Sequence, residues 1–324
     1  MKISIYSQSC YRHLLSALLV IFLLSACQNS DVNKINYPIG SFPETVTSFI
    51  SANSPFDDFN SGPTPLLQLE FPFHFSSNRS TQGGTFDIES MRVDVVFNQN
   101  TGKFSMEASS APGSMVWPGT NTSSNEYGPA IVYLPDHRTL YFYASDVSGN
   151  LDIYHIVGSG SVKASSALNS MNDDAYPTFG PDSAIYFTSN RGGNFDIYRA
   201  EVPSDVDVPT WLEGSGNAVI TKVDALSTAH NDKCPYINGK LLVFTSDRPG
   251  GYGGYDLYYS IYGTDGWSVP INFGPSINTA YDEYRPAAVY APDYSNDLMI
   301  FSSNRPGGMG GFDLYYVGIQ KMIK

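Results

Sequence analysis

The chain has 324 residues, of which 42% are hydrophobic and 15% charged. This apolar content suffices for a packed core and excludes a chain that is disordered throughout. The 18 Lys and Arg against 31 Asp and Glu give a formal net charge of −13, which argues against a nucleic-acid partner. The 23 Tyr, 19 Phe, 29 Gly and 21 Pro are typical of short strands joined by tight turns, and they predict an all-β fold.

The amino-terminal segment has the pattern of an export signal. Lys2 and Arg12 precede the apolar run Leu14–Leu24, which is too short to span a bilayer. The run ends in Leu-Ser-Ala-Cys at Cys27, which resembles the cleavage box of bacterial lipoproteins, where the cysteine is lipidated and the leader is cut before it. An ordinary secretory leader, with Cys27 incidental, is the alternative.

These features divide the chain into three parts. We expect residues 1–26 to be a lipoprotein signal peptide, residues 27–40 a polar tether and residues 41–324 the folded domain. The protein is then predicted to be lipid-anchored in a bacterial cell envelope, at the outer membrane by analogy with lipoprotein sorting. Cys234 is left without a disulfide partner in the mature chain, and we expect it to be a small buried filler.

A short pattern recurs five times along the domain. It consists of an aromatic residue, two small residues, Asn or Asp, usually Arg, a glycine-rich stretch and an Asp followed by Ile or Leu, as in FTSNR and FDIY from Phe187 to Tyr198. Four copies carry the arginine, and the second copy has Val147 instead. The arginines are Arg79, Arg191, Arg248 and Arg305, and the aspartates that begin the last element are Asp87, Asp152, Asp196, Asp256 and Asp313.

A second box precedes each copy. It ends in an acidic residue that is followed, in the last four copies, by a proline three residues later. The acidic members are Asp58, Glu126, Asp174, Asp232 and Glu283. We expect the acid and the arginine of a repeat to join two loops on one face through bidentate hydrogen bonds. Because these residues repeat with the fold, we predict a structural role for them, and likewise for the aspartates, which are expected to accept loop N–H groups.

Each repeat predicts a small antiparallel sheet. The first strand follows the proline, as at Ala130–Leu134, the second is aromatic, as at Ala184–Thr188, and a fourth leads to the next box, as at Ser268–Phe273. Strands with large apolar residues on both faces are buried on both sides, so the sheets should stack around an axis as a β-propeller. Five blades are predicted. Six is the alternative if the spacing after Asp87 hides another sheet, although a hairpin of 92–97 with 103–106 accounts for much of it.

The ring is predicted to close at the chain ends. The last copy stops within its third strand, Asp313–Ile319, whereas the segment Phe42–Ile50 precedes the first box without a blade of its own. We therefore expect Phe42–Ile50 to be the outer strand of the last blade, which removes an exposed sheet edge.

The repeats resemble the TolB-like, WD-repeat-like propellers of bacterial envelope proteins, over about residues 41 to 324. The box of the last copy is most similar to propellers that accompany OmpA-like, peptidoglycan-anchoring domains, and no such domain follows here. The resemblance implies a non-enzymatic protein-binding or scaffolding module, with envelope or peptidoglycan-associated proteins as partners and no cofactor or metal.

Two further predictions concern function. The loops of copies four and five present Tyr252 and Met309, which we expect to offer apolar contact area for a partner. The alternative function is a carbohydrate-active propeller that binds or hydrolyses glycans. Hydrolysis needs carboxylates in different environments, and the acids that break the repeat lie mostly in insertions or outer strands, so we expect no catalytic residue.

Overall fold

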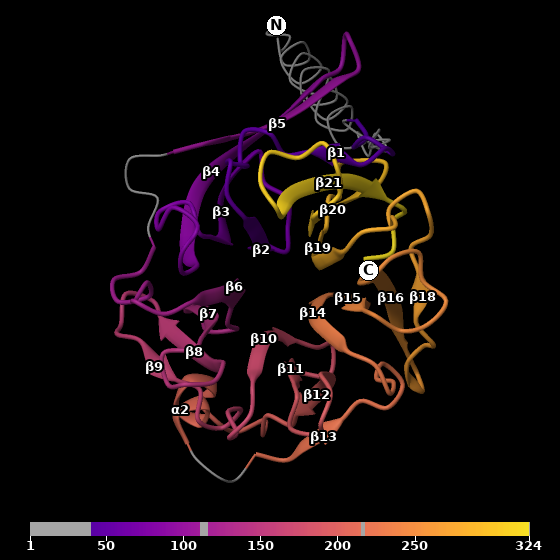
Figure 1. Ribbon diagram of the computed structural model, residues 1–324. Coiled ribbons are helices and arrows are strands. Elements are labelled where there is room, and N and C mark those ends of the chain that lie inside the picture. The colour runs from indigo at the N-terminus through magenta and orange to yellow at the C-terminus, as the bar shows by residue number, and fades with distance from the viewer. Residues whose placement is uncertain (1–39, 111–115, 215–217, 324) are drawn as a thin grey trace, which may run out of the picture. The chain divides into compact units, whose positions relative to one another are not determined.

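The computed structural model describes residues 40–110, 116–214 and 218–323. In this part of the chain five antiparallel sheets surround a common axis, so the all-β fold and the five-bladed propeller are confirmed (Figure 1). Cys27 and the predicted tether lie outside the described residues, which leaves lipidation a prediction.

In the first three blades the strands run in chain order from the axis outward. Blade one contains β2 (Asp58–Gly62), β3 (Glu70–Ser77), β4 (Asp87–Asn98) and β5 (Lys103–Ser109). Blade two contains β6 (Glu126–Tyr133), β7 (Thr139–Ser145), β8 (Asp152–Val157) and β9 (Lys163–Ala164). Blade three contains β10 (Asp174–Phe179), β11 (Ile185–Ser189), β12 (Asp196–Ala200) and β13 (Ile220–Lys222).

The last two blades complete the ring. Blade four contains β14 (Asp232–Asn238), β15 (Leu241–Ser246), β16 (Asp256–Gly263), β17 (Gly266–Trp267) and β18 (Ile271–Asn272). Blade five contains β19 (Glu283–Val289), β20 (Asp297–Ser303), β21 (Asp313–Ile319) and β1 (Thr47–Ser48). Within the described residues the helix α2 (Val208–Glu213) connects β12 to β13, and none there is long and apolar enough to cross a membrane.

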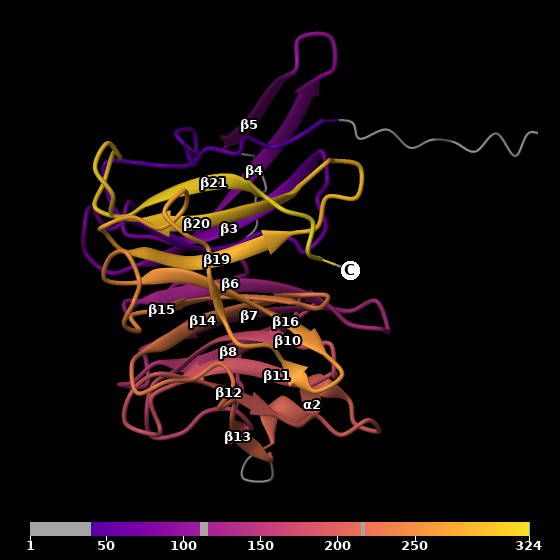
Figure 2. The same cartoon turned by 90° about the vertical axis from the view of Figure 1, so that its right-hand side faces the viewer.

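The long spacing in blade one holds a hairpin. β4 pairs with β5 from Arg92↔Ser109 to Asn98↔Lys103, and the hairpin projects beyond the rest of its blade (Figure 2). This pairing belongs to the fourth strand of blade one, so the six-bladed alternative is excluded.

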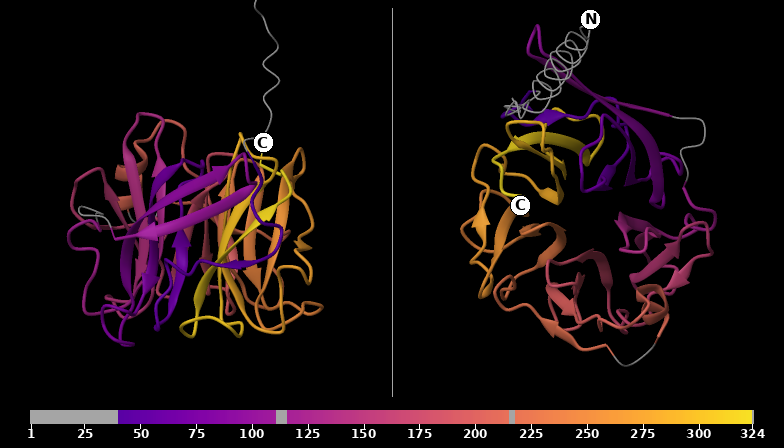
Figure 3. Two further views of the ribbon diagram at one scale, coloured as in Figure 1. Left: turned by 90° about the horizontal axis from the view of Figure 1, so that it is seen from above. Right: turned by 180° about the vertical axis from the view of Figure 1, so that it is seen from behind.

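The ring closes through the predicted seam. β1 pairs with β21 through Thr47↔Tyr316 and Ser48↔Tyr315, which makes it the outermost strand of blade five. Around it, the Phe49 N–H donates to the Leu314 carbonyl at 2.9 Å. Phe42 and Phe49 are each 1% exposed, so the segment is held by its side chains as well as by the sheet. Both ends of the propeller therefore meet in one blade (Figure 3).

The innermost strands begin earlier than expected. Each starts at the acidic residue of its box, so that β6 starts at Glu126 rather than at Ala130. Two residues later every inner strand has a positive φ and a register shift, at Asn60, Gly128, Tyr176, Cys234 and Arg285. In four blades a proline follows, and a bulge tolerates proline because its missing N–H is not needed there. The sequence analysis placed the start of the first strand after the proline, because it assigned the residues of this bulge to the preceding loop.

The core lies between neighbouring blades. One aromatic position of the second strand is buried in all five sheets. Its members are Phe75, Tyr143, Phe187, Phe244 and Phe301. Burying large side chains on both faces of a sheet favours stacked blades over an open, one-sided sheet. The fourth strand predicted at Ser268–Phe273 is shorter than expected, since only Ile271 and Asn272 pair with β16.

Candidate functional site

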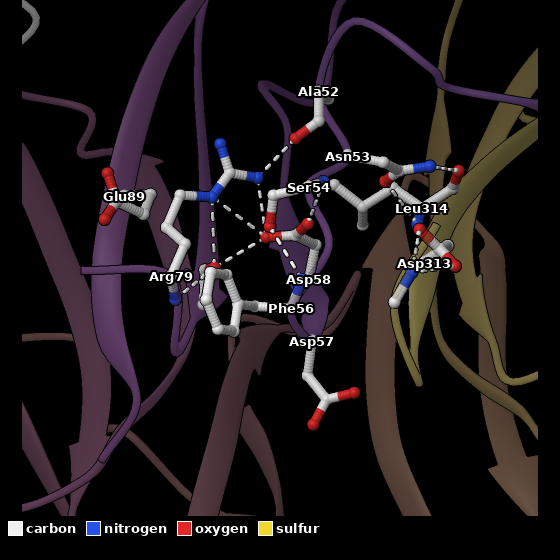
Figure 4. Close-up of polar contacts among 12 residues, drawn as sticks. Ala52, Asn53, Ser54, Phe56, Asp57, Asp58, Arg79, Glu89, Asp313 and Leu314 are labelled. Atoms are coloured by element: carbon white, nitrogen blue, oxygen red, sulfur yellow. Dashed lines mark hydrogen bonds and ion pairs between the residues drawn. The ribbon is translucent and has the colours of Figure 1, made fainter. Parts of the chain in front are cut away.

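An acid and an arginine pair in four of the five blades, on the face of the propeller where the inner strands begin. The acids are fully buried, and 14–20% of each arginine side chain is exposed. The ion pairs are Arg79–Asp58, Arg191–Asp174 and Arg248–Asp232 at 2.6 Å and Arg305–Glu283 at 2.9 Å. Figure 4 shows the pair of blade one, where Arg79 also donates to the Ala52 carbonyl.

The hydrogen bonding of these pairs differs from the expected bidentate form. In blade five, Arg305 Nη2 donates to one oxygen of Glu283 and, at 2.8 Å, to the Ile277 carbonyl, while Nε donates to Ser303 Oγ. The second oxygen of Glu283 accepts the Thr279 N–H at 2.8 Å. The guanidinium therefore binds three different groups, and it joins the box before the inner strand to the loop after the second strand.

A second set of polar pairs was missed from the sequence. Two positions are involved in every blade: the residue directly before the acid of the box, and the residue directly after the last Ser of the second strand. One of these positions holds Asp and the other holds Asn, and which holds which differs between blades. The amide donates to the carboxylate in Asn125–Asp146 (2.7 Å), Asn190–Asp173 (3.0 Å), Asn231–Asp247 (2.8 Å) and Asn304–Asp282 (3.1 Å). Because the two positions exchange their residue types between repeats, comparing the five copies at both positions together would have revealed them.

The aspartates that begin the third strands do not share one environment. Asp256 accepts the Tyr252 N–H at 2.7 Å and Asp313 accepts the Met309 N–H at 2.9 Å, which is the expected loop bonding. Asp152 instead accepts Ser148 Oγ, and Asp196 lies 3.6 Å from Lys222 Nζ. Within the described residues no hydrogen bond to the Asp87 carboxylate is seen. Asp87 is thus the member of this set with the freest carboxylate.

Blade two breaks the symmetry of the acid–arginine pairs. Glu126 is fully buried, and Val147 occupies the arginine position. Its carboxylate accepts Thr122 Oγ1 at 2.6 Å and Ser145 Oγ at 3.0 Å, with no cation among its partners in the described residues. Burial raises the pKa of Glu126, and the negative charge of nearby Asp87 raises it further. Burial also raises the pKa of Asp87, so the pKa of both neighbouring carboxyl groups at this junction is raised.

Three aromatic side chains lie at the same junction between blades one and two. The ring centroids of Phe59 and Phe86 are 4.8 Å apart, and Tyr127 lies 5.8 Å from Phe59 and 5.4 Å from Phe86. All three are partly exposed, and Phe86 and Tyr127 adjoin Asp87 and Glu126 in the chain. We call Phe59, Phe86 and Tyr127 the aromatic trio.

Lys233 occupies in blade four the strand position that Tyr127 holds in blade two. Its Nζ lies 4.2 Å from the centre of the Phe195 ring and 5.4 Å from that of Tyr284, a cation–π arrangement. Burial lowers the pKa of Lys233. Aromatic rings therefore surround this position in both blades, at the end of the propeller axis where the inner strands begin. We call the space along the axis between the inner strands the channel, and this end of it the channel entrance.

Farther along the axis, the residues at the bulges fill the channel. Tyr176 accepts a hydrogen bond from Asn60 Nδ2 at 3.3 Å, and the Arg285 guanidinium lies 4.9 Å from the centre of its ring. Glycine is required at 128, because a Cβ there would lie 2.3 Å from a ring carbon of Tyr176. Cys234 is fully buried beside them, as expected.

The far end of the channel holds a pocket of about 260 Å³. Prolines, the Tyr133, Phe179 and Tyr236 rings and Asn238 line it, and no Asp, Glu or His does so. The residues that line this pocket therefore include no carboxylate or imidazole that could act as a general acid or base. Among the described residues, no group of three or more His, Cys, Asp or Glu side chains is arranged to hold a metal ion.

Tyr252 and Met309 lie on loops, as expected, and each is 48% exposed. The neighbouring aromatic residues Tyr255 and Phe312 pack between blades, as expected: the Tyr255 ring centroid lies 5.6 Å from that of Tyr284 in blade five, and the Phe312 centroid lies 5.8 Å from that of Phe59 in blade one. The two exposed side chains do not join the aromatic trio.

Comparisons with known proteins support the architecture. No family model matches the chain, and no curated protein matches it in sequence. A thermostable family-43 glycoside hydrolase has a similar structure with a TM-score of 0.51 and 12% identity, over 83% of this chain and 91% of that one. An endo-arabinase from Bacteroides thetaiotaomicron has a TM-score of 0.50 and 12% identity, over 88% and 98%.

These similarities establish a shared fold. They also correct one expectation from the sequence: the prediction that the chain is not an enzyme is contradicted, because the solved propellers that it resembles are named as glycoside hydrolases and an arabinase. The symmetry argument behind that prediction was incomplete. It looked for acids outside the repeat, whereas Glu126 lies inside the repeat and is distinguished by the loss of its arginine.

Proposed function

We propose that this protein is a carbohydrate-active propeller whose site is the junction of blades one and two at the channel entrance. The observation that carries the proposal is the neighbouring pair of carboxylates, Asp87 and Glu126, which lie beside the aromatic trio and have no cation partner in the described part of the chain. The resemblance to glycoside hydrolase propellers favours this function over the scaffolding role suggested by the repeats.

The chemistry of the junction suits a sugar. The partly exposed rings of Phe59, Phe86 and Tyr127 offer apolar faces on which the C–H surface of a pyranose or furanose can stack. Glycoside hydrolysis uses a carboxylic acid with a raised pKa to protonate the leaving oxygen, together with a second carboxylate. Asp87 is partly exposed and can reach a bound ligand. Glu126 is fully buried, so we assign it as a positioning residue that acts through Asp87. Asp87 is then the proposed general acid, and this pair does not itself supply the second carboxylate that hydrolysis uses.

The test combines binding and turnover on a glycan panel that includes arabinan. We expect the wild-type protein to bind one class of oligosaccharide and to release reducing ends from it. Asp87→Asn should abolish release while it leaves binding within about threefold, and Phe86→Ala should weaken binding by about tenfold or more, the loss of one stacking contact. Glu283→Gln is the stability control, because it changes a buried acid of blade five, far along the chain from Asp87 and Phe86, at the repeat position that Glu126 holds in blade two.

Two outcomes would contradict the proposal. One is no binding to any glycan of the panel by a folded wild-type protein. The other is an equal loss of binding in Phe86→Ala and Glu283→Gln, which would mean that binding is weakened by a general loss of protein stability and not by the loss of one stacking contact. If binding is found without turnover and Asp87→Asn has no effect on it, the protein is a glycan-binding module and Asp87 is not catalytic.

The cellular setting belongs to the same proposal. We propose that Cys27 carries the lipid and holds the propeller at a bacterial envelope membrane, because the leader ends in Leu-Ser-Ala-Cys. The similarity of the repeats to TolB-like envelope propellers supports this location, where glycans and glycan-bound proteins would be within reach.

A further inference from the structure

A buried cation without a counterion lies in the channel. Arg285 is 1% exposed and follows the first two residues of β19. Its Nη1 donates to the Pro235 carbonyl at 3.3 Å, whereas Nε and Nη2 have no hydrogen-bond partner among the described residues. Two donor groups of a fully enclosed guanidinium are therefore unsatisfied.

The neighbours of Arg285 are donors and aromatic rings rather than carboxylates. Its guanidinium lies over Tyr176, and Cys234, Tyr236 and Tyr284 are close enough to influence its charge. The acid of its own box, Glu283, is paired with Arg305, and the acid of the adjacent blade, Asp232, is paired with Arg248. No ion pair of Arg285 is seen in the described part of the chain.

The side chains around Arg285 do not supply the missing negative charge. Burial raises the pKa of the Cys234 thiol, and it raises the pKa of Tyr176 and Tyr284 well above the ordinary value. These groups are consequently neutral near pH 7. Burial lowers the pKa of Arg285, but arginine stays protonated in proteins, so the charge persists, and leaving it buried without a counterion is strongly unfavourable.

We propose that the propeller channel holds a small inorganic anion, of halide size, bound to Nε and Nη2 of Arg285. The enclosure of Arg285 excludes a sugar or a peptide carboxylate, and its positive charge with the two unpaired donors Nε and Nη2 favours an anion over a cation. Tyr176 borders the site, because the Arg285 guanidinium lies 4.9 Å from the centre of its ring. This ion is independent of the proposed carbohydrate site and would serve the stability of the ring.

The first experiment locates the ion directly. Crystals of the wild-type protein grown in sodium bromide should show an anomalous bromine peak within about 3.5 Å of the Arg285 guanidinium, the reach of an ionic hydrogen bond. A water molecule at that place, with no anomalous signal, would overturn the proposal.

The second experiment measures the linkage between the anion and folding. At constant ionic strength, replacing sodium gluconate by sodium bromide should raise the melting temperature of the wild type in a saturable way. Arg285→Met should lose this shift, and Arg138→Met, which removes an exposed arginine, should keep it. An equal shift in all three proteins would refute the site. Another pair of results would assign the counterion to Cys234. If bromide does not stabilise the wild type, and if Cys234→Ser lowers the melting temperature more at pH 9 than at pH 7, then the thiolate is the counterion and the proposal is wrong.

Discussion

Replacing Arg305 by alanine tests how the acid–arginine pairs hold the blades. The change removes the hydrogen bonds from the guanidinium to Glu283, Ser303 and Ile277, and it removes the packing of the guanidinium 5.2 Å from the centre of the Phe301 ring. Glu283 remains fully buried, so its charge loses the only cation that contacts it in the described residues.

The expected loss in the free energy of unfolding depends on the hydrogen bonds that Glu283 keeps. Breaking a buried pair by removing one partner costs about 3–5 kcal/mol when the other charge is left alone. Here Glu283 retains Thr279 N, Thr279 Oγ1 and Ser303 Oγ as donors, which lowers the cost to about 2–3 kcal/mol. Blade two shows that such a state is tolerated, since Glu126 has the same three kinds of donor and no arginine.

The effect should depend on pH. Burial raises the pKa of Glu283 above its ordinary value of 4.5, whereas the Arg305 charge lowers it. Without Arg305 the folded-state pKa rises further. The variant should therefore approach wild-type stability below pH 4.5, where the carboxyl is protonated in both states, and lose stability as the pH rises through the folded-state pKa.

Urea denaturation at pH 7 and pH 4 measures both effects. The converse variant, Val147→Arg, supplies the missing arginine of blade two and should stabilise by up to about 1 kcal/mol if it reaches Glu126. A loss below about 0.5 kcal/mol for Arg305→Ala, the typical range of an exposed substitution, would refute the role of these pairs. So would a loss that is the same at both pH values.

Four further predictions address the other regions. The raised pKa of Glu126 means that this residue lowers the free energy of unfolding of the wild type as the pH rises above about 4.5. Glu126→Gln cannot titrate and should lack this decrease, which urea denaturation curves from pH 3 to 8 would show. Deleting residues 42–50 should cost at least about 4 kcal/mol, since two buried Phe side chains and a sheet edge are lost, and a melting temperature equal to that of a chain lacking residues 30–39 would be inconsistent with the seam. Cys27→Ser should move the protein out of the membrane fraction and remove the lipid mass, as fractionation and mass spectrometry would show. Replacing Tyr252 and Met309 together by alanine should leave the melting temperature nearly unchanged, because both are about half exposed, while a lower recovery of envelope partners in pull-downs would assign these loops to binding.

The sequence determined the architecture because every blade repeats the same local instructions. Five boxes, five aromatic second strands and five Asp-initiated third strands predict five sheets, and the unmatched segment Phe42–Ile50 predicts where the ring closes. The acids and arginines that form the ion pairs were also recognisable, since four copies carry the same two residues at the same spacing. Repetition turned weak single motifs into a strong prediction.

Only the tertiary structure decided which side chains meet across blades. Asp87 and Glu126 belong to different sheets and approach each other because the third strand of one blade adjoins the inner strand of the next. The surroundings of Arg285 depend on the positive φ at each bulge, which turns one residue per inner strand toward the axis, and sequence periodicity contains no signal for that turn. Val147 in place of the arginine already indicated from the sequence that Glu126 lacks the partner of the other acids. Contacts between residues dozens of positions apart depend on closure of the whole ring, and for this reason the proximity of Asp87 to Glu126 and the buried charge of Arg285 emerged only from the structure.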